Sequence, residues 1–166
     1  MASYEKGKKE LKEFLNRSFP DGSTALDVGA CDGEYWNLLH DHFIMDGVEV
    51  FLPNIERNKL TEKYRIVHPC DIYGFEYDWF DLVIFGDVIE HMEVDQAQAV
   101  LEYAKHHSKM VIVAVPFRYK QGAIYGNPYE RHIQDDLTDA IFKERYDGFK
   151  LLFDYSNYAY YVWSMS

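Results

Sequence analysis

The sequence predicts an α/β fold in which helices cover both faces of a doubly wound, mainly parallel sheet of seven strands. Short, continuous apolar runs alternate with segments of helical periodicity, which is typical of parallel strands that are buried on both faces. The last two strand-like segments flank Ser156-Asn157, which predicts a closing antiparallel hairpin. With 166 residues and no linker-like stretch, we expect a single domain, residues 1–166.

A strand precedes each helix after the first, and each helix shows apolar residues three or four positions apart. We expect strands at residues 24–28, 44–50, 64–67, 81–85, 110–115, 150–155 and 158–164. We expect helices at residues 4–17, 34–42, 53–63, 87–107 with a break near residue 93, and 137–146. Pro20 ends the first helix, whereas Pro53 begins the third, because proline is favoured in a first turn. The clearest strand begins at Met110, where six apolar residues follow one another.

Composition and charge narrow the classes of function. The formal net charge is −11 at pH 7, and a chain of this charge repels phosphate backbones, so we expect no nucleic-acid partner. No apolar run approaches the length of a membrane span, and residues 1–14 lack the apolar core of a signal peptide. We therefore expect no membrane partner and a cytoplasmic location. Cys31 and Cys70 have neither the spacing of a zinc site nor the number needed for a disulfide framework.

The segment from Ala25 to Gly33, with the sequence ALDVGACDG, joins the first strand to the next helix. Its glycines permit a tight turn and close contact between the backbone and a ligand. A dinucleotide fingerprint has the form G-x-G-x-x-G, but Cys31 and Glu34 stand at its second and third glycines. Glu34 would also repel a pyrophosphate. The turn therefore favours a cofactor without phosphates, and an NAD(P)-dependent oxidoreductase or epimerase is the alternative.

Two segments resemble the class I S-adenosylmethionine-dependent methyltransferases. LDVGACDG resembles the first motif of that family, LDxGxGxG, with Cys31 at its middle glycine, and FDLVIFGDVIEH resembles the later segment FDxVxxxxVLEH. The resemblance spans about Leu26 to Leu152. It implies a Rossmann-like fold, S-adenosylmethionine as cofactor and methyl transfer as the reaction. It also implies which residues hold the amino-acid part of the cofactor: Asp27, Gly29, Ala30, Cys31 and Gly33.

The other cofactor contacts follow in chain order. Glu49 lies 20 residues after Gly29, where a carboxylate can accept hydrogen bonds from both ribose hydroxyls, and Val50 adjoins it. Glu56 is the rival position, but it lies within an expected helix. The resemblance implies that an acid and an apolar residue after the third strand contact adenine. These contacts would come from Asp71 and Ile72, and we add a helix-capping acid that faces the cofactor, Asp87.

His91 is the best candidate for a general base, because imidazole titrates near neutral pH. Methyl transfer from a sulfonium is an in-line displacement with an activated electrophile, so alignment and exclusion of water carry most of the catalysis. A base is needed only where the acceptor must lose a proton early. The alternative is that His91 orders its loop and takes no part in proton transfer.

The long segment 116–136 is predicted to face the acceptor, because loops of this length in compact domains are often functional. Tyr125, Tyr129 and His132 are its candidate substrate-binding residues. The alternative is that its tyrosines only pack over the sheet edge. We expect a small-molecule acceptor with an oxygen or nitrogen nucleophile. A cofactor-binding partner subunit without activity of its own is the third functional alternative.

We expect no bound metal ion, but the sequence contains one candidate set of ligands. Asp87, Glu90 and His91 have i, i+3, i+4 spacing, so one helix face could present all three. With His132 they would form a mixed oxygen and nitrogen set suited to a divalent cation. Some small-RNA and quinone O-methyltransferases have a similar ExxEH cluster that holds a divalent ion.

Overall fold

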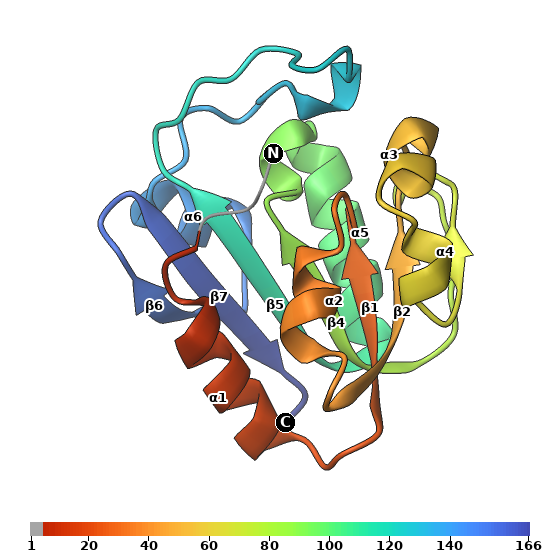
Figure 1. The fold of residues 1–166 in the computed structure, drawn as a ribbon. Helices are drawn as coiled ribbons and strands as arrows, with labels where there is room; N and C mark the ends of the chain where they lie inside the picture. The colour runs from red at the N-terminus through yellow and green to blue at the C-terminus, as the bar shows by residue number, and fades with distance from the viewer. Residues whose placement is uncertain (1–4) are drawn as a thin grey trace.

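Seven strands form one sheet in the order β3-β2-β1-β4-β5-β7-β6 (Figure 1). The computed structural model describes residues 5–166, so Tyr4, where the first helix was expected to begin, lies outside them. The strands are β1 (Ser23–Val28), β2 (Phe43–Val48), β3 (Val67–His68), β4 (Phe80–Gly86), β5 (Ser108–Pro116), β6 (Lys150–Asp154) and β7 (Tyr158–Ser164). Strands β1 to β5 pair in parallel, and β7 lies antiparallel between β5 and β6. The predicted fold class is confirmed.

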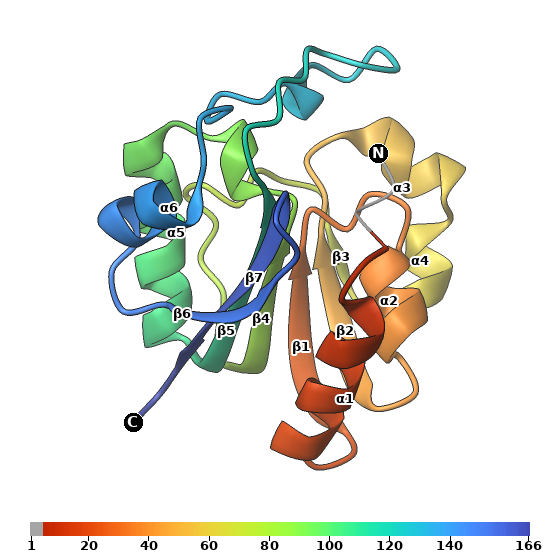
Figure 2. The ribbon, with the colours of Figure 1, turned by 90° about the vertical axis from the view of Figure 1, so that its left-hand side faces the viewer.

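Helices cover both faces of the sheet (Figure 2). They are α1 (Lys8–Ser18), α2 (Glu34–Leu39), α3 (Leu52–Arg57), α4 (Leu60–Lys63), α5 (Val94–His106) and α6 (Asp139–Arg145), with short 3₁₀ helices η1 (Ile89–His91) and η2 (Pro128–Glu130). Residues of α1, α2 and α4 pack on one face, and residues of α5 and α6 pack on the other. Within residues 5–166, no helix combines the length and the apolar character that crossing a membrane requires.

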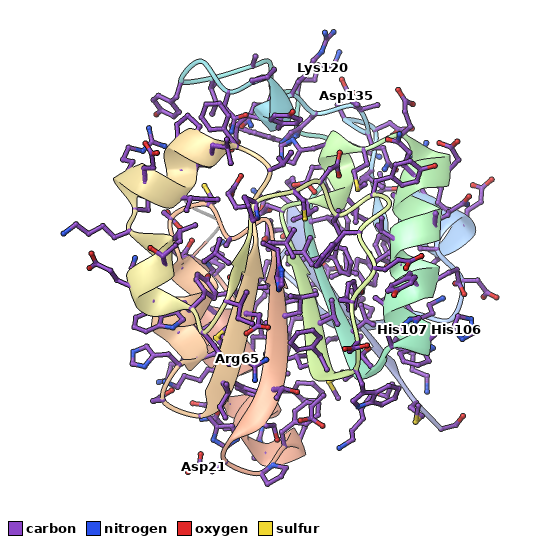
Figure 3. The ribbon with its side chains drawn as sticks, turned by 90° about the vertical axis from the view of Figure 1, so that its right-hand side faces the viewer. Asp21, Arg65, His106, His107, Lys120 and Asp135 are labelled. Carbon is purple, nitrogen blue, oxygen red and sulfur yellow. The ribbon has the colours of Figure 1, made fainter. Side chains whose placement is uncertain are left out.

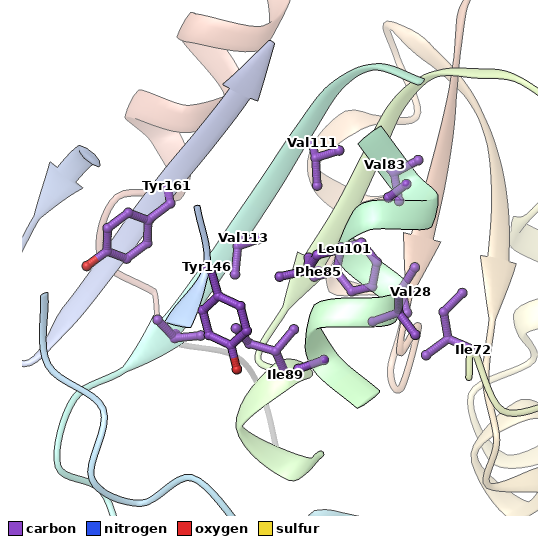
Figure 4. Close-up of a cluster of buried hydrophobic side chains, with 14 of the residues drawn as sticks. Val28, Ile72, Val83, Phe85, Ile89, Leu101, Val111, Val113, Tyr146 and Tyr161 are labelled. Carbon is purple, nitrogen blue, oxygen red and sulfur yellow. The ribbon is translucent and has the colours of Figure 1, made fainter. Parts of the chain in front are cut away.

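The continuous apolar strands are explained by burial on both faces. Along β5, Val111 and Val113 face α5, whereas Ile112 and Ala114 face the opposite layer of helices. Figure 4 shows the first of these layers, in which valines of three strands surround Leu101 of α5. Because every side chain in the centre of the sheet is covered, the strand sequences do not alternate between apolar and polar residues.

Two expected elements differ from the structure. The helix expected at 53–63 is divided into α3 and α4, because Lys59 between them has a left-handed backbone with φ of 50°. The strand expected at 64–67 is reduced to β3, because only Val67 and His68 pair with β2. The expected break near residue 93 is confirmed, since Glu93 is extended and separates η1 from α5.

Gly86 allows the end of β4 to contact the ring of Tyr35 from α2. A Cβ atom at residue 86 would lie 2.1 Å from Cε2 of Tyr35 and 2.7 Å from its hydroxyl oxygen. The ring is only 5% exposed and has little room to move. We expect Gly86→Ala to lower the free energy of unfolding by about 1–3 kcal/mol in urea denaturation.

The matched control for this prediction is Gly122→Ala. Apart from its chain neighbours, no heavy atom lies within 4 Å of the Cβ position at residue 122. The free energy of unfolding of Gly122→Ala should therefore stay within about 0.5 kcal/mol of wild type. Equal effects of the two substitutions would contradict the proposed contact between Gly86 and Tyr35.

Candidate functional site

A cavity of about 590 Å³ opens at the carboxyl ends of four parallel strands. It is lined by Val28 of β1, Val48 of β2, Gly86 of β4 and Pro116 of β5, among others. Strand β1 has β2 on one side and β4 on the other, so the strand order reverses there. Ligands of open α/β sheets bind outside the carboxyl ends of the strands at such a switch point. The segment 117–136 passes over this edge, opposite the end marked by Asp21 (Figure 3).

The turn after β1 is held by a buried carboxylate from the end of β2. Glu49 is 4% exposed, and its two oxygens accept hydrogen bonds from the backbone N–H groups of Cys31 (2.8 Å) and Phe51 (2.7 Å). Gly29 has φ of 73°, and Cys31 also has a positive φ, 46°. Burial raises the pKa of Glu49, although both N–H groups stabilise its charged form. Glu49 therefore fixes the shape of the turn and still faces the cavity, which it helps to line.

Most of the residues predicted to contact cofactor or substrate meet at this cavity. The predicted residues that line it are Gly29, Ala30, Cys31, Glu49, Val50, Asp71, Ile72, Asp87, His91, Tyr129 and His132. These residues come from five different segments of the chain, and parallel strand order brings them together at one edge. Their shared position is consistent with a nucleoside-sized ligand that extends from the β2 end toward the loop 117–136.

Three predicted residues do not line the cavity. Asp27 is 1% exposed and lies beneath the turn, where it accepts a hydrogen bond of 2.5 Å from the hydroxyl of Tyr64. Gly33 is the N-cap of α2, and its Cα faces the side chain of Lys63. Tyr125 is 82% exposed, because positive φ values at Tyr125 and Gly126 form a tight turn that directs the ring outward. The structure does not place these three residues in the cavity lining, and their contacts with a ligand stay predictions.

Asp27→Asn is expected to remove part of the pH dependence of stability. Burial raises the pKa of Asp27 from 3.8 to about 7, so the folded state binds its proton more tightly than the unfolded state does. The contribution of this proton to stability is complete below about pH 4 and is lost as the pH rises through 7. Asparagine keeps an oxygen for Tyr64 but cannot ionise.

The measurement is urea denaturation of wild type and Asp27→Asn between pH 4 and pH 8. The stability of wild type relative to the variant should fall with rising pH, by at most about 4 kcal/mol. Asp78→Asn is the control, because Asp78 is exposed in the loop before β4 and does not line the cavity. A stability difference that does not change with pH would contradict the buried, protonated state of Asp27.

Two carboxyl groups, Asp87 and Glu90, lie close together at the end of β4. Asp87 has φ of 55°, and its carboxylate accepts a hydrogen bond of 2.9 Å from the hydroxyl of Tyr158. Glu90 is 1% exposed, and neither of its side-chain oxygens has a hydrogen-bond partner. Burial raises the pKa of Asp87 to about 7, while burial and the neighbouring charge of Asp87 raise the pKa of Glu90. The pair therefore retains a proton near neutral pH.

Two histidines next to Glu90 present unprotonated ring nitrogens. Nδ1 of His91 lies 3.1 Å from the carbonyl oxygen of Arg131, and Nδ1 of His132 lies 2.7 Å from that of Tyr119. A carbonyl only accepts hydrogen bonds, so each Nδ1 carries the proton and each Nε2 keeps its lone pair. Burial lowers the pKa of both histidines.

Glu90, His91 and His132 form a possible cation site. One ligand atom from each residue can be chosen so that all three lie within 4.8 Å of one another. Asp87, which the helical spacing placed in this set, is absent from it. The reason is that residues 87–91 form a turn and a 3₁₀ helix in place of one α-helical face. The remaining set of one carboxylate and two neutral imidazoles suits a divalent metal ion.

Gln134 holds this cluster together, and no motif in the sequence identified it. Its side chain is 3% exposed and donates to the carbonyl oxygens of Ile89 (2.8 Å) and Met92 (3.0 Å). Its Oε1 accepts a hydrogen bond from the hydroxyl of Tyr146 (2.7 Å). The backbone N–H groups of residues 133 and 134 both donate to the carbonyl oxygen of Glu90. A single glutamine in a loop carries no sequence signal for such a role.

Solved structures of other proteins share the fold of this chain, although the comparisons of sequence found no match. No protein-family model matches the sequence, and no curated protein matches it either. The N-terminal domain of EvdMO1, solved with S-adenosylhomocysteine bound, superposes with a TM-score of 0.73 at 13% identity, covering 99% of this chain and 83% of that chain. An S-adenosylmethionine-dependent methyltransferase from Clostridium acetobutylicum gives 0.74 at 11% identity, covering 99% and 93%. The methyltransferase domain of bacterial CtHen1 gives 0.68 at 20% identity, covering 95% and 97%. The chain therefore has the fold of the class I S-adenosylmethionine-dependent methyltransferases.

Proposed function

We propose that the protein is an S-adenosylmethionine-dependent methyltransferase that acts on an oxygen or nitrogen atom of a small-molecule acceptor. The observation that carries this proposal is Glu49, a buried carboxylate that fixes the turn after β1 and lines the cavity at the end of β2. A carboxylate offers about four acceptor positions, so Glu49 can accept a ribose hydroxyl in addition to these bonds. Asp71 and Ile72 line the same cavity and are suited to contact adenine.

The first turn of α2 argues against a diphosphate cofactor. The N–H group of Glu34 donates to the side chain of Asp32 (3.1 Å), and the N–H of Gly33 donates to the carbonyl oxygen of Ala30 (2.7 Å). The N-terminus of α2 is thus capped by a carboxylate from its own chain, and Glu34 places a second acid there. A pyrophosphate would need those N–H groups and would be repelled by Asp32, whereas Glu34 forms an ion pair with Lys8. The NAD(P)-dependent alternative is therefore disfavoured.

Catalysis in this proposal depends on alignment and on one proton acceptor. When bound, the cofactor supplies a methyl group carried on a sulfonium. The loop 117–136, which passes over the cavity, is called the covering loop below. Its residues Tyr119 and Tyr129 line the cavity and restrict the access of water to it. Nε2 of His91 has a free lone pair, and the lowered pKa of this histidine keeps it unprotonated at neutral pH. It can accept the proton that the acceptor loses.

A metal-assisted form of the reaction is the second candidate, and the unpartnered oxygens of Glu90 favour it. A buried carboxylate without a hydrogen-bond partner is costly unless a ligand neutralises it. Glu90, His91 and His132 would hold a divalent cation, and each histidine already donates its other ring N–H to a carbonyl oxygen, as metal-ligating histidines commonly do. Such an ion would polarise an acceptor hydroxyl. In this form His91 is a ligand and does not act as the base.

Titration calorimetry with S-adenosylmethionine, S-adenosylhomocysteine and NADH tests the proposal. We expect micromolar binding of the two sulfur nucleosides, about −8 kcal/mol, and no binding of NADH. Binding of NADH alone would replace the proposal with the oxidoreductase alternative. Tight binding of S-adenosylmethionine without turnover on a broad acceptor panel would favour the non-catalytic partner subunit.

A further inference from the structure

The cavity is lined by acids and, among the described residues, by neither lysine nor arginine. Its acidic residues are Asp32, Glu34, Glu49, Asp71, Asp87, Glu90 and Glu130. From this and from the observations below, we infer that the methyl acceptor is a neutral or cationic hydrogen-bond donor that carries no phosphate, carboxylate or sulfate group. The inference rests on the proposed function and specifies its substrate class.

Two contacts lower the negative charge of the lining without removing it. Lys8 forms an ion pair with Glu34, and Asp87 and Glu90 retain a proton between them. The other acids of the lining include Asp32, Glu49 and Asp71, and among the described residues no lysine or arginine lines the cavity beside them. An anionic acceptor would therefore lie against a lining rich in acids and would be repelled at close range.

Four basic residues of neighbouring segments do not line the cavity. Lys120 and Arg131 of the covering loop border a second, more open cavity. Lys120 points away from the molecule in Figure 3. The ammonium of Lys63 donates to the carbonyl oxygen of Asp32, and Arg145 pairs with Asp136 outside the cavity. None of these four side chains lines the main cavity, where an acceptor phosphate or carboxylate would have to lie.

Several polar atoms of the lining are buried without a hydrogen-bond partner, and each of them can accept a hydrogen bond. Both side-chain oxygens of Glu90 and Oε1 of Gln121 are buried without partners, and both residues line the cavity. Buried acceptors of this kind are normally satisfied by a donor or a cation. The hydroxyl of Tyr35, which is also unpartnered, can donate or accept. A ligand that supplies O–H or N–H groups complements this lining, and an anion does not.

Glu130 of the covering loop is the residue through which this charge can be tested. Burial is the main cause of the raised pKa of both Glu49 and Glu90, and the charge of Glu130 adds to it in each case, so Glu130 acts on groups at both ends of the cavity. Glu130→Gln removes one charge and keeps the shape of the side chain. Glu144→Gln is the matched control, because Glu144 is exposed on α6 and does not line the cavity.

The experiment uses three probes of one shape: tyramine, 4-hydroxybenzyl alcohol and 4-hydroxybenzoate. Their binding to the protein saturated with S-adenosylhomocysteine is measured by ligand-observed NMR. We expect the cationic and neutral probes to bind at least about 10-fold more tightly than the anion. In Glu130→Gln this preference should fall several-fold, whereas Glu144→Gln should resemble wild type. Equal binding of the three probes, including no binding by any, or a preference for the anion overturns the inference.

The proposed function and the inferred acceptor class can fail separately. If wild type does not bind S-adenosylhomocysteine in calorimetry, the proposed function fails before any acceptor is added. If the nucleoside binds and 4-hydroxybenzoate is preferred, only the inferred acceptor class fails.

Discussion

Replacement of Glu49 by glutamine is expected to weaken the binding of S-adenosylhomocysteine by about 100-fold or more. The carboxylate accepts two backbone N–H groups, from Cys31 and Phe51, and both are hydrogen bonds to a charged group. A glutamine amide can accept only one of them and presents its NH₂ group to the other. Each charge-assisted bond of this kind contributes roughly 1.5–3 kcal/mol. The loss should therefore distort the turn as well as the presumed ribose contact. Calorimetry gives the dissociation constants.

Glu56→Gln is the control for this experiment. Glu56 is the other acid that the sequence offers for the ribose, but the structure places it on the exposed side of α3, outside the cavity. The affinity of Glu56→Gln for S-adenosylhomocysteine should stay within about two-fold of wild type, because most surface substitutions have small effects. A larger loss of affinity in Glu56→Gln than in Glu49→Gln would transfer the ribose site to α3.

His132→Ala is expected to abolish cation binding at the second candidate site. Removal of one of three ligands leaves Glu90 and His91, which is too few to hold a divalent ion firmly. Loss of even an outer partner of a ligand typically weakens metal affinity 10–100-fold, so loss of a ligand should weaken it by about 100-fold or more. The measurement is a calorimetric titration of the protein with Mn²⁺.

His106→Ala provides the control, because His106 is exposed on α5, remote from the cavity. The His106→Ala variant should bind Mn²⁺ with the affinity of wild type. If wild type does not bind Mn²⁺, or if His132→Ala binds it equally well, the metal-assisted form is wrong. The proton-accepting role of His91 would then be the remaining proposal for this cluster.

Burial explains why the sequence predicts the fold so well. The centre of β5 is covered on both faces, so residues 110–115 are all apolar and the run is unmistakable. The weakest prediction was β3, an edge strand of two paired residues, where little burial acts on the sequence. The division of the helix at 53–63 depends on the backbone of one residue, Lys59. No periodic signal marks such a position.

The site was harder to predict because its details depend on tertiary contacts. Asp27 belongs to the segment that resembles the first motif of the class I methyltransferases. A hydrogen bond from Tyr64, which is distant in sequence, holds it beneath the cavity. Tyr125 belongs to the right loop, but the local turn directs it to solvent. Gln134 and Tyr158 act by hydrogen bonds to residues more than 40 positions away. Spacing in the sequence cannot reveal pairs of this kind.

A crystal structure of the protein with S-adenosylhomocysteine tests the central claim most directly. The ribose hydroxyls should lie within hydrogen-bond distance of Glu49, with adenine against Ile72 and no phosphate group near the first turn of α2. An empty cavity at saturating nucleoside, or a diphosphate compound bound at that turn, would contradict the account.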